Sequence, residues 1–209
     1  MQILDSLAWR YATKKFDANR FLTTEQVDTL KEAFNLTATS YGLQPLRLVV
    51  INNKELQEQL VPHSWNQRQV ADASHVLVLC IENTIDTAYI ESYFDRVKTI
   101  RNTPDEIIAP FKEFMINSFK DKTQEDLDTW AAKQAYIAMG NLLTVCGVER
   151  IDACPMEGFV PEKYDEVLGL EAHGISSVLV LPVGYRAEDD MFADFKKVRK
   201  TIAESILEL

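Results

Sequence analysis

A chain of 209 residues, 46% hydrophobic and 26% charged, can bury one sizeable core, and we expect a single domain over residues 1–209. Its formal net charge of -10 argues against nucleic acid or an anionic membrane as the main partner, and no apolar run approaches the roughly 20 residues of a membrane span. The chain start shows no signal-peptide pattern, and the three cysteines form no CxxC pair, so we expect a reducing, cytoplasmic setting.

The first half of the chain predicts two helices followed by two strands. Apolar spacing favours a helix over residues 3–11, and Thr23 with Gln26 forms a capping-box pattern that opens a second helix, ending near residue 36. A loop over residues 37–45 separates this helix from a strand over residues 46–52. A second strand, residues 75–81, is apolar throughout, which is typical of strands buried on both faces.

The second half is mainly helical. We expect helix over residues 88–122 with breaks at Pro104 and Pro110, and a strong helix over residues 124–146 in which Gly140 allows close packing. The wide apolar arc of that helix fits either a buried core helix or a dimer interface. The remaining predictions are a loop (152–159), a short helix (161–170), a strand (176–183) and a helical pattern in the charged tail (195–206). Helices wrapped around a sheet indicate an α+β or α/β fold.

Standard catalytic and metal motifs are missing from the sequence. No GxGxxG follows a predicted strand, and there is no Walker loop, GxSxG or HExxH. The three histidines lack metal-ligand spacing, and His75 is more simply explained as a structural residue at the start of a strand. The cysteines are expected to be buried core thiols: Cys80, Cys146 and Cys154.

Two basic clusters lie at opposite ends of this acidic chain, in residues 10–15 and 195–200. Cations gathered against the overall charge favour a single anionic ligand held from both sides, and a phosphate is the natural candidate. Arginine can grip a phosphate in a fork, and lysine can neutralise it as a point charge. Two solvated helix faces would explain the clusters equally well.

Further short motifs follow one another in a fixed order: Arg10 with Thr13-Lys14 and Phe16, Ser40 with Gln44-Pro45, Asn66, residues 72–76, Trp130 with Lys133-Gln134, Gly140-Asn141, residues 155–159, residues 182–184, and Lys197 with Arg199. Their order and spacing resemble the oxygen-insensitive NAD(P)H nitroreductases, an FMN-dependent family that includes dihydropteridine reductase-like members. The resemblance covers essentially the full chain.

The resemblance implies an α+β, nitroreductase-like fold, with a central mixed, mostly antiparallel sheet wrapped by helices, in an intertwined homodimer with its sites at the interface. It implies FMN as cofactor, NADH or NADPH as donor, and a nitroaromatic or quinone acceptor reduced by two electrons in a ping-pong reaction. No side chain need act as acid, base or nucleophile. Pteridine or enoate reduction, dehalogenation, flavin breakdown, or flavin binding with little turnover are the alternatives.

The resemblance also implies roles for individual residues. Arg10, Lys197 and Arg199 would bind the FMN phosphate, and Lys14 would lie near the N1/C2 edge of the ring, where a fixed positive charge favours the reduced flavin. Asn66 would bind the pyrimidine edge, and the backbone N–H of Glu157 would approach N5. The full implied cofactor set is Arg10, Tyr11, Ala12, Lys14, Thr39, Ser40, Gly42, Asn66, Gln69, Gln134, Pro155, Met156, Glu157, Gly158, Lys197 and Arg199.

The sequence departs from the family pattern at several of these positions. Gln69 replaces a frequent lysine, which predicts a lower flavin potential or weaker affinity for NAD(P)H phosphates, and Ala12 replaces a common serine. The family's Ser-Ser-x-Asn loop is Thr39-Ser40-Tyr41-Gly42, and this loop would reach the flavin of the other subunit. Tyr41 is either packed or lines the substrate channel.

Residues 95–122 would cover the mouth of the site. They contain Phe111, Phe114 and Phe119, and helical spacing favours core packing for at least two of the three. One of them could instead stack on the substrate or the nicotinamide. The predicted substrate-binding residues are therefore Tyr41, Phe111 and Phe114.

Overall fold

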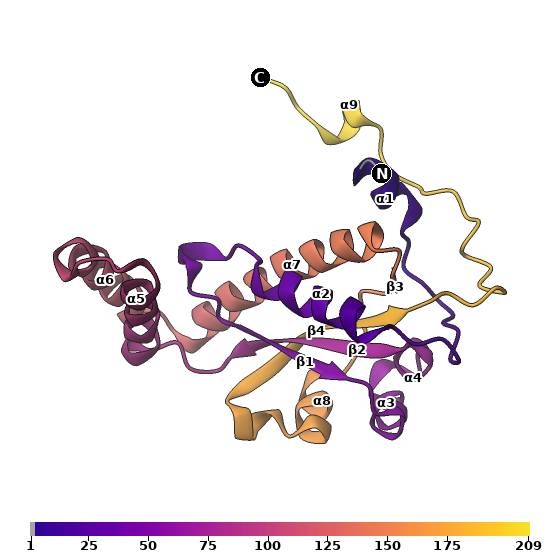
Figure 1. Ribbon diagram of the computed structural model, residues 1–209, viewed down its shortest axis with the longest axis horizontal. Helices are drawn as coiled ribbons and strands as arrows, with labels where there is room; N and C mark the ends of the chain where they lie inside the picture. Colours follow the sequence, from indigo (N-terminus) through magenta and orange to yellow (C-terminus); the bar gives the residue numbers. More distant parts are fainter. Residues whose placement is uncertain (1–2) are drawn as a thin grey trace.

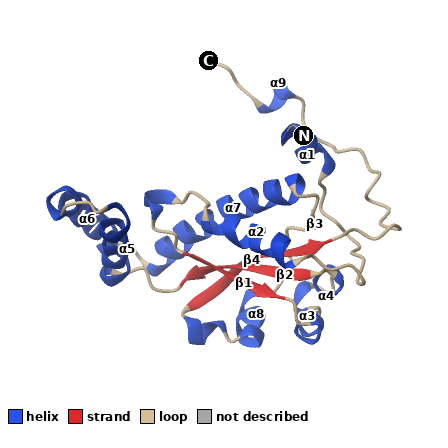
Figure 2. Cartoon of the chain, in the orientation of Figure 1, coloured by secondary structure: helices blue, strands red, loops and turns tan. Residues whose placement is uncertain are grey.

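A four-stranded sheet forms the centre of the computed structural model, which describes residues 3–209, and helices cover both of its faces (Figure 1, Figure 2). The strands lie in the order β1-β2-β4-β3, and every neighbouring pair is antiparallel. The α+β fold and the mostly antiparallel sheet are thus confirmed. Among the described residues, the parallel component is a single bridge between Ala12 and Ala153. The strand bounds are β1 Leu46–Ile51, β2 His75–Glu82, β3 Asp152–Ala153 and β4 Ile175–Gly184.

Strand β2 separates two cores because its side chains alternate between the faces of the sheet. Val76 and Val78 join the core on one side, and Leu77 and Leu79 join the core on the other. All four are fully buried, as the continuous apolar run of this strand predicted. Both sheet faces are therefore closed to solvent along β2, and a ligand must bind at an edge or an end of the sheet.

Two layers of helices cover these cores (Figure 1). Helices α2 (Thr24–Asn35) and α7 (Gln124–Val148) pack together on one face. Helices α3 (Lys54–Leu60), α4 (Gln69–Asp72) and α8 (Pro161–Leu168) lie on the other face. Helices α5 (Thr87–Arg101) and α6 (Asp105–Lys120) form a hairpin beyond one end of the sheet, and α1 (Ile3–Trp9) and α9 (Ile202–Ser205) lie near the other end. Short 3₁₀ turns occur at Ser40–Gly42, Pro62–Ser64 and Leu170–His173.

Sequence-encoded caps start the two helices that pack on the sheet. The Thr23 hydroxyl accepts from the Gln26 N–H while the Gln26 side chain accepts from the Thr23 N–H, which confirms the predicted capping box. Thr123 and Asp126 form the same reciprocal pair at the start of α7. Each cap satisfies two backbone donors that the first turn would otherwise leave unpaired, so both helices begin at a fixed residue.

Two predictions are wrong. Helix α6 continues through Pro110, because the carbonyl of Glu106 that loses its partner lies in an exposed turn and can bind water; only the Pro104 break occurs. The tail is mostly irregular, with one short helix, α9, because its apolar side chains have no surface of this chain to pack against. At Gly140, no atom of this chain lies within 4 Å of a built Cβ, so this chain does not itself supply the predicted close packing.

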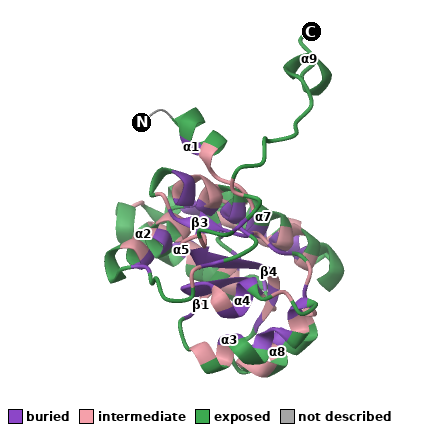
Figure 3. Cartoon of the chain, turned by 90° about the vertical axis from the view of Figure 1, so that its right-hand side faces the viewer, coloured by how far each residue is buried: buried purple, intermediate pink, exposed green. Residues whose placement is uncertain are grey.

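The buried residues lie in the sheet and on the helix faces that cover it, whereas the C-terminal segment extends away from these layers (Figure 3). All three cysteines are buried and free, as predicted, and His75 is buried with Nδ1 2.9 Å from the Ser74 hydroxyl. Apart from the half-buried Ala193, residues 191–209 are exposed. Among residues 3–209, no helix combines the length and apolar character needed to cross a bilayer.

Candidate functional site

The segment that carries the first basic cluster, residues 10–15, runs along the edge of the sheet. Ala12 bridges to Ala153 in β3, and the N–H of Thr13 donates to the Ala153 carbonyl over 3.2 Å. Phe16 then forms an antiparallel bridge with Arg186, just beyond β4. The backbone of this segment is therefore fixed on both sides although it belongs to no helix or strand.

Cations from both ends of the chain converge beside this segment. Lys197 donates a hydrogen bond from Nζ to the Arg10 carbonyl, and burial followed by the charge of Arg199 lowers the pKa of Arg10. The pKa of Lys197 is lowered by burial and then by Arg10 and Arg199. Within residues 3–209, no salt bridge includes Arg10, Lys197 or Arg199. These three residues, the basic cluster, repel one another and have no carboxylate to neutralise them.

The basic cluster has the properties of a phosphate site. The Nε of Arg10 is buried and finds no hydrogen-bond partner among the described residues. A buried donor without an acceptor costs on the order of 1–3 kcal/mol, and more where the group is charged, as here. A phosphate dianion would supply the acceptor and also relieve the repulsion between the cations. Arg10, Lys197 and Arg199 therefore fit the phosphate of a nucleotide-like cofactor.

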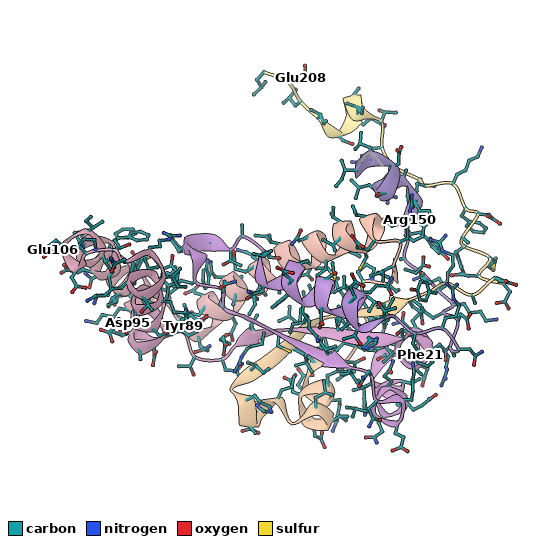
Figure 4. The ribbon with its side chains drawn as sticks, in the orientation of Figure 1. Phe21, Tyr89, Asp95, Glu106, Arg150 and Glu208 are labelled. Carbon is teal, nitrogen blue, oxygen red and sulfur yellow. The ribbon has the colours of Figure 1, made fainter. Side chains whose placement is uncertain are left out.

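Behind the basic cluster, a buried ion pair stiffens the same region. Arg186 donates from Nε to Asp152 over 2.7 Å, and its guanidinium lies over the rings of Trp9 and Tyr11, 4.4 Å and 4.5 Å from their centroids. Arg150, labelled in Figure 4 just beyond the end of α7, also lies over the Trp9 ring, 4.6 Å from its centroid. Stacked aromatic rings and cations connect α1 to the end of the sheet.

The loop over residues 155–158 follows β3 and lies between two elements that hold it. The N–H of Met156 donates to the Val180 carbonyl over 2.8 Å. The Tyr136 hydroxyl on α7 donates to the Glu157 carboxylate over 2.8 Å, and Gln67 Nε2 donates to the Gly158 carbonyl over 3.0 Å. The peptide expected to approach the flavin N5 is thus held from both sides.

Close packing explains the glycine in this loop. A Cβ built on Gly158 would lie 2.9 Å from the Trp65 ring, which is shorter than any normal contact. Trp65 and the next residue, Asn66, both have left-handed backbone, with φ of 55° and 59°. The Asn66 side chain is exposed and makes no hydrogen bond to a described residue, so its amide is free to bind a ligand. Strained backbone of this kind is common at binding sites.

The loop with Thr39, Ser40 and Gly42 lies elsewhere. The N–H of Ser40 donates to Gln134 Oε1 over 2.9 Å, whereas the Arg10 side chain lies near Gly147, thirteen residues further along α7. Thirteen helical residues span about 20 Å. The structure thus brings segment 10–14 together with Lys197 and with Ala153, just before the 155–158 loop, and it brings that loop together with residues 65–67. The 39–42 loop with Gln134 lies well away from the basic cluster of the same chain.

Comparison with known proteins agrees with this geometry. A model of the nitroreductase family matches residues 7–185. The chain belongs to the nitroreductase family.

Individual relatives extend this match. The oxygen-insensitive NAD(P)H nitroreductase of Enterobacter cloacae is 32% identical over 100% of both chains. A protein from Exiguobacterium sibiricum, crystallised in complex with FMN, superposes with a TM-score of 0.85 at 19% identity and covers 100% of this chain and 98% of its own. CLA-ER, an enone reductase, superposes with a TM-score of 0.81 at 18% identity, with coverage of 100% and 97%. The two solved structures show a shared fold.

The hairpin of α5 and α6 holds the predicted substrate-binding phenylalanines of this nitroreductase-family chain. Phe119 is buried and packs edge-on against Trp130, whereas Phe111 and Phe114 are about half exposed and stack on each other, with ring centroids 6.2 Å apart. The prediction that at least two of the three are core residues is wrong for this chain. Tyr41, with φ of 60°, is partly exposed and contacts Phe119 edge-on.

Sequence reasoning missed the acidic residues behind the site. Asp152 and Asp190 are buried, and both accept hydrogen bonds from backbone N–H groups of the surrounding loops. No motif marks them, since Asp190 follows two exposed acidic residues in an acidic chain. The contact between Asp190 and residues 14–15 joins distant parts of the chain, so only the three-dimensional structure reveals it.

Proposed function

We propose that this protein is an FMN-dependent NAD(P)H oxidoreductase that reduces nitroaromatic or quinone acceptors. The observation that carries the proposal is the basic cluster of Arg10, Lys197 and Arg199, with a buried guanidinium nitrogen that lacks an acceptor. Membership of the nitroreductase family supports it, as does the activity named for the Enterobacter cloacae relative. The FMN complex of the Exiguobacterium sibiricum protein supports the cofactor.

FMN, when bound, accepts two electrons from NADH or NADPH and passes them to the acceptor in a second half-reaction. The protein binds and orients the cofactor and sets the charge around it. Arg10, Lys197 and Arg199 hold the phosphate, and Lys14 supplies positive charge to the ring. The backbone N–H of Glu157, whose carboxylate accepts from the Tyr136 hydroxyl, would face the ring. No side chain is needed as an acid, a base or a nucleophile.

Gln69 changes the electrostatics of the predicted site. Its side chain is buried at the start of α4, three residues after Asn66, at a position where the family resemblance implies a lysine. Because an amide carries no charge, the ring is left with Lys14 as its main positive neighbour. We therefore expect a lower flavin potential than in relatives with two lysines.

A homodimer with shared sites completes the proposal. The exposed face of α7 carries Tyr136, Ile137 and Val148, and the tail, residues 191–209, exposes eight further large apolar side chains. Exposed apolar groups gathered in this way are typical of an interface. A second subunit would also explain why the 39–42 loop lies about 20 Å along α7 from the basic cluster, since it would serve the partner's flavin. The three buried free thiols support a reducing, cytoplasmic location.

Enoate reduction is the second candidate acceptor chemistry, because the enone reductase CLA-ER has the same fold. Phe111 and Phe114 are exposed on the hairpin of α5 and α6. Contacts with this surface would decide which class of acceptor binds. Parallel assays with menadione, a nitroaromatic and a conjugated enone rank the acceptor classes directly.

The visible spectrum of the purified protein tests the proposal first. We expect a flavin spectrum that bleaches when NADH or NADPH is added without oxygen and recovers when menadione is added. A colourless protein that also fails to bind added FMN would overturn the proposal. A bound flavin that neither donor bleaches would leave a flavin-binding protein without this activity.

Replacing Arg199 by alanine tests the phosphate assignment. Loss of a charged hydrogen bond to phosphate is worth on the order of 10–100-fold in affinity, so FMN should bind that much more weakly, whereas riboflavin, which lacks the phosphate, should bind almost as before. Flavin titration of the stripped protein measures both. Lys200→Ala, a neighbouring cation outside the basic cluster, is the control and should change neither affinity. Equal losses for the two flavins would remove the assignment.

A further inference from the structure

Asp190 lies at the point where the chain leaves the folded body. It is 5% exposed, while every residue after it except the half-buried Ala193 is exposed. The hydrogen bonds of residues 191–199 run within that stretch or to Asp190, with one exception, the bond from Lys197 to the Arg10 carbonyl. Asp190 is therefore the last buried residue before Lys197 and Arg199, the two tail cations of the basic cluster.

The Asp190 carboxylate binds the N-terminal segment directly. Its Oδ2 accepts from the N–H groups of Lys14 and Lys15 over 2.9 Å and 3.1 Å, and from the Tyr11 hydroxyl over 2.8 Å. Its Oδ1 accepts from the N–H of Phe192, the second residue of the tail, over 3.1 Å. One carboxylate thus holds the turn between the bridges at Ala12 and Phe16, and also the first residues of the tail.

Asp190 performs this role as an anion without a cationic partner. Within the described chain, no salt bridge includes it. Burial opposes its ionisation, but hydrogen bonds from Lys14, Tyr11 and Lys15 outweigh burial, so the pKa of Asp190 is lowered. Burial and the bond to Asp190 raise the pKa of Tyr11, which keeps its hydroxyl a donor. Directed N–H and O–H groups alone stabilise this charge.

We propose that Asp190 is the positioning residue that joins the two ends of the chain into one phosphate site, and that it thereby sets the preference for FMN over riboflavin. The proposal rests on the proposed function. Without this carboxylate, the two amides of the turn lose their acceptor and the start of the tail loses its attachment. Arg10, Lys197 and Arg199 would then no longer be held close together. Binding of the phosphate would weaken more than binding of the flavin ring.

A neighbouring residue provides a matched control. Asp189 also binds the N-terminal segment, but only through the ammonium group of Lys15, and its side chain is 70% exposed. Exposed ion pairs of this kind contribute little to stability. Asp190→Asn and Asp189→Asn therefore remove the same charge from adjacent positions, and only the first replaces a carboxylate oxygen that accepts from backbone N–H groups by an NH2 group that cannot accept.

The experiment titrates flavin-stripped wild-type protein and both variants with FMN and with riboflavin, following the quenching of flavin fluorescence. We expect Asp190→Asn to weaken FMN by about tenfold or more and riboflavin by less than about threefold, while Asp189→Asn changes neither. Equal losses for the two flavins would show a merely structural role, and an Asp190→Asn titration that matches Asp189→Asn would also overturn the inference. Wild-type protein that binds no FMN would instead overturn the proposed function itself.

Tyr11→Phe keeps the inference testable if Asp190→Asn does not fold. It removes one of the three donors to Oδ2 and leaves the carboxylate in place. We expect Tyr11→Phe to weaken FMN by about threefold and riboflavin by less, because the lost hydroxyl is one of the donors that hold the Asp190 carboxylate. Equal losses for the two flavins, or no change in FMN affinity, would count against Asp190.

Discussion

Gly158 occupies a position where space, rather than backbone conformation, requires glycine. Its φ lies outside the left-handed region, but an added Cβ would meet the Trp65 ring at 2.9 Å and the Gln67 amide at 3.0 Å. Trp65 has left-handed backbone, and its side chain is largely exposed. A methyl group here must therefore displace either the Trp65 ring or the loop that is proposed to approach the flavin ring.

Gly158→Ala should consequently weaken FMN by about tenfold while the fold persists, because the added methyl displaces the peptide that approaches the ring. Flavin titration and thermal unfolding measure the two effects separately. Gln67→Ala, which removes the bond to the Gly158 carbonyl without adding bulk, should cause a smaller loss of affinity. Wild-type FMN affinity in Gly158→Ala would mean that the loop does not approach the flavin closely.

At the level of elements, the sequence predicted what depends on local pattern. The buried strands, the Thr23 cap and the long α7 follow from apolar spacing and capping chemistry, which act within a few residues. Pro110 was expected to end a helix, yet its exposed turn lets water replace the lost bond. The proposed site residues came from family resemblance, and Asp190 was missed because its partners lie more than 170 residues away.

No contact within a single chain explains why α7 has a glycine at position 140. A glycine inside a helix costs about 1 kcal/mol relative to alanine, and no atom of this chain lies within 4 Å of a built Cβ there. Gly140 is exposed on α7 within one turn of Tyr136 and Ile137, whose side chains are also exposed. Close approach of a second α7 at this face would explain the glycine.

Gly140→Leu should therefore weaken the proposed dimer strongly, by about tenfold or more in its dissociation constant, because the added side chain prevents close approach of the helices. Sedimentation velocity over a range of concentrations measures this. Gln59→Leu, an exposed helical position on the opposite layer, is the control and should leave assembly unchanged. If Gly140→Leu stays dimeric and gains thermal stability, as a better helix former would in a free helix, the interface lies elsewhere.

The whole molecule brings its two ends to one side of the sheet, where α1, β3 and the start of the tail meet (Figure 1). This convergence makes two basic clusters, separated by most of the chain, into one cluster around Arg10. The strand order β1-β2-β4-β3 produces it by placing β4 next to β3, beside which the N-terminal segment runs. Long-range pairing of this kind has no local sequence pattern, so composition and periodicity alone could not predict it.

Beyond Arg199, the last ten residues pack against none of the three cores of the described chain. Ile202, Ile206, Leu207 and Leu209 are all largely exposed, and the two cores on the sheet end well before them. Full burial of each such side chain contributes about 1.5–3 kcal/mol of free energy. Packing of these residues against a second subunit would therefore stabilise the dimer substantially. Deletion of residues 200–209 should leave the monomer folded, retain Lys197 and Arg199, and shift the protein toward monomer at micromolar concentration.

Sedimentation velocity and circular dichroism measure assembly and folding of the shortened chain. FMN should bind more weakly at low protein concentration and recover at high concentration, because the proposed sites are shared between subunits. Glu208→Gln, which changes a charged residue between two apolar ones, is the control and should assemble like the wild type. A shortened chain that assembles as the full chain does would show that the tail makes no subunit contact. Concentration-independent FMN binding in that chain would show that each site is complete within one subunit.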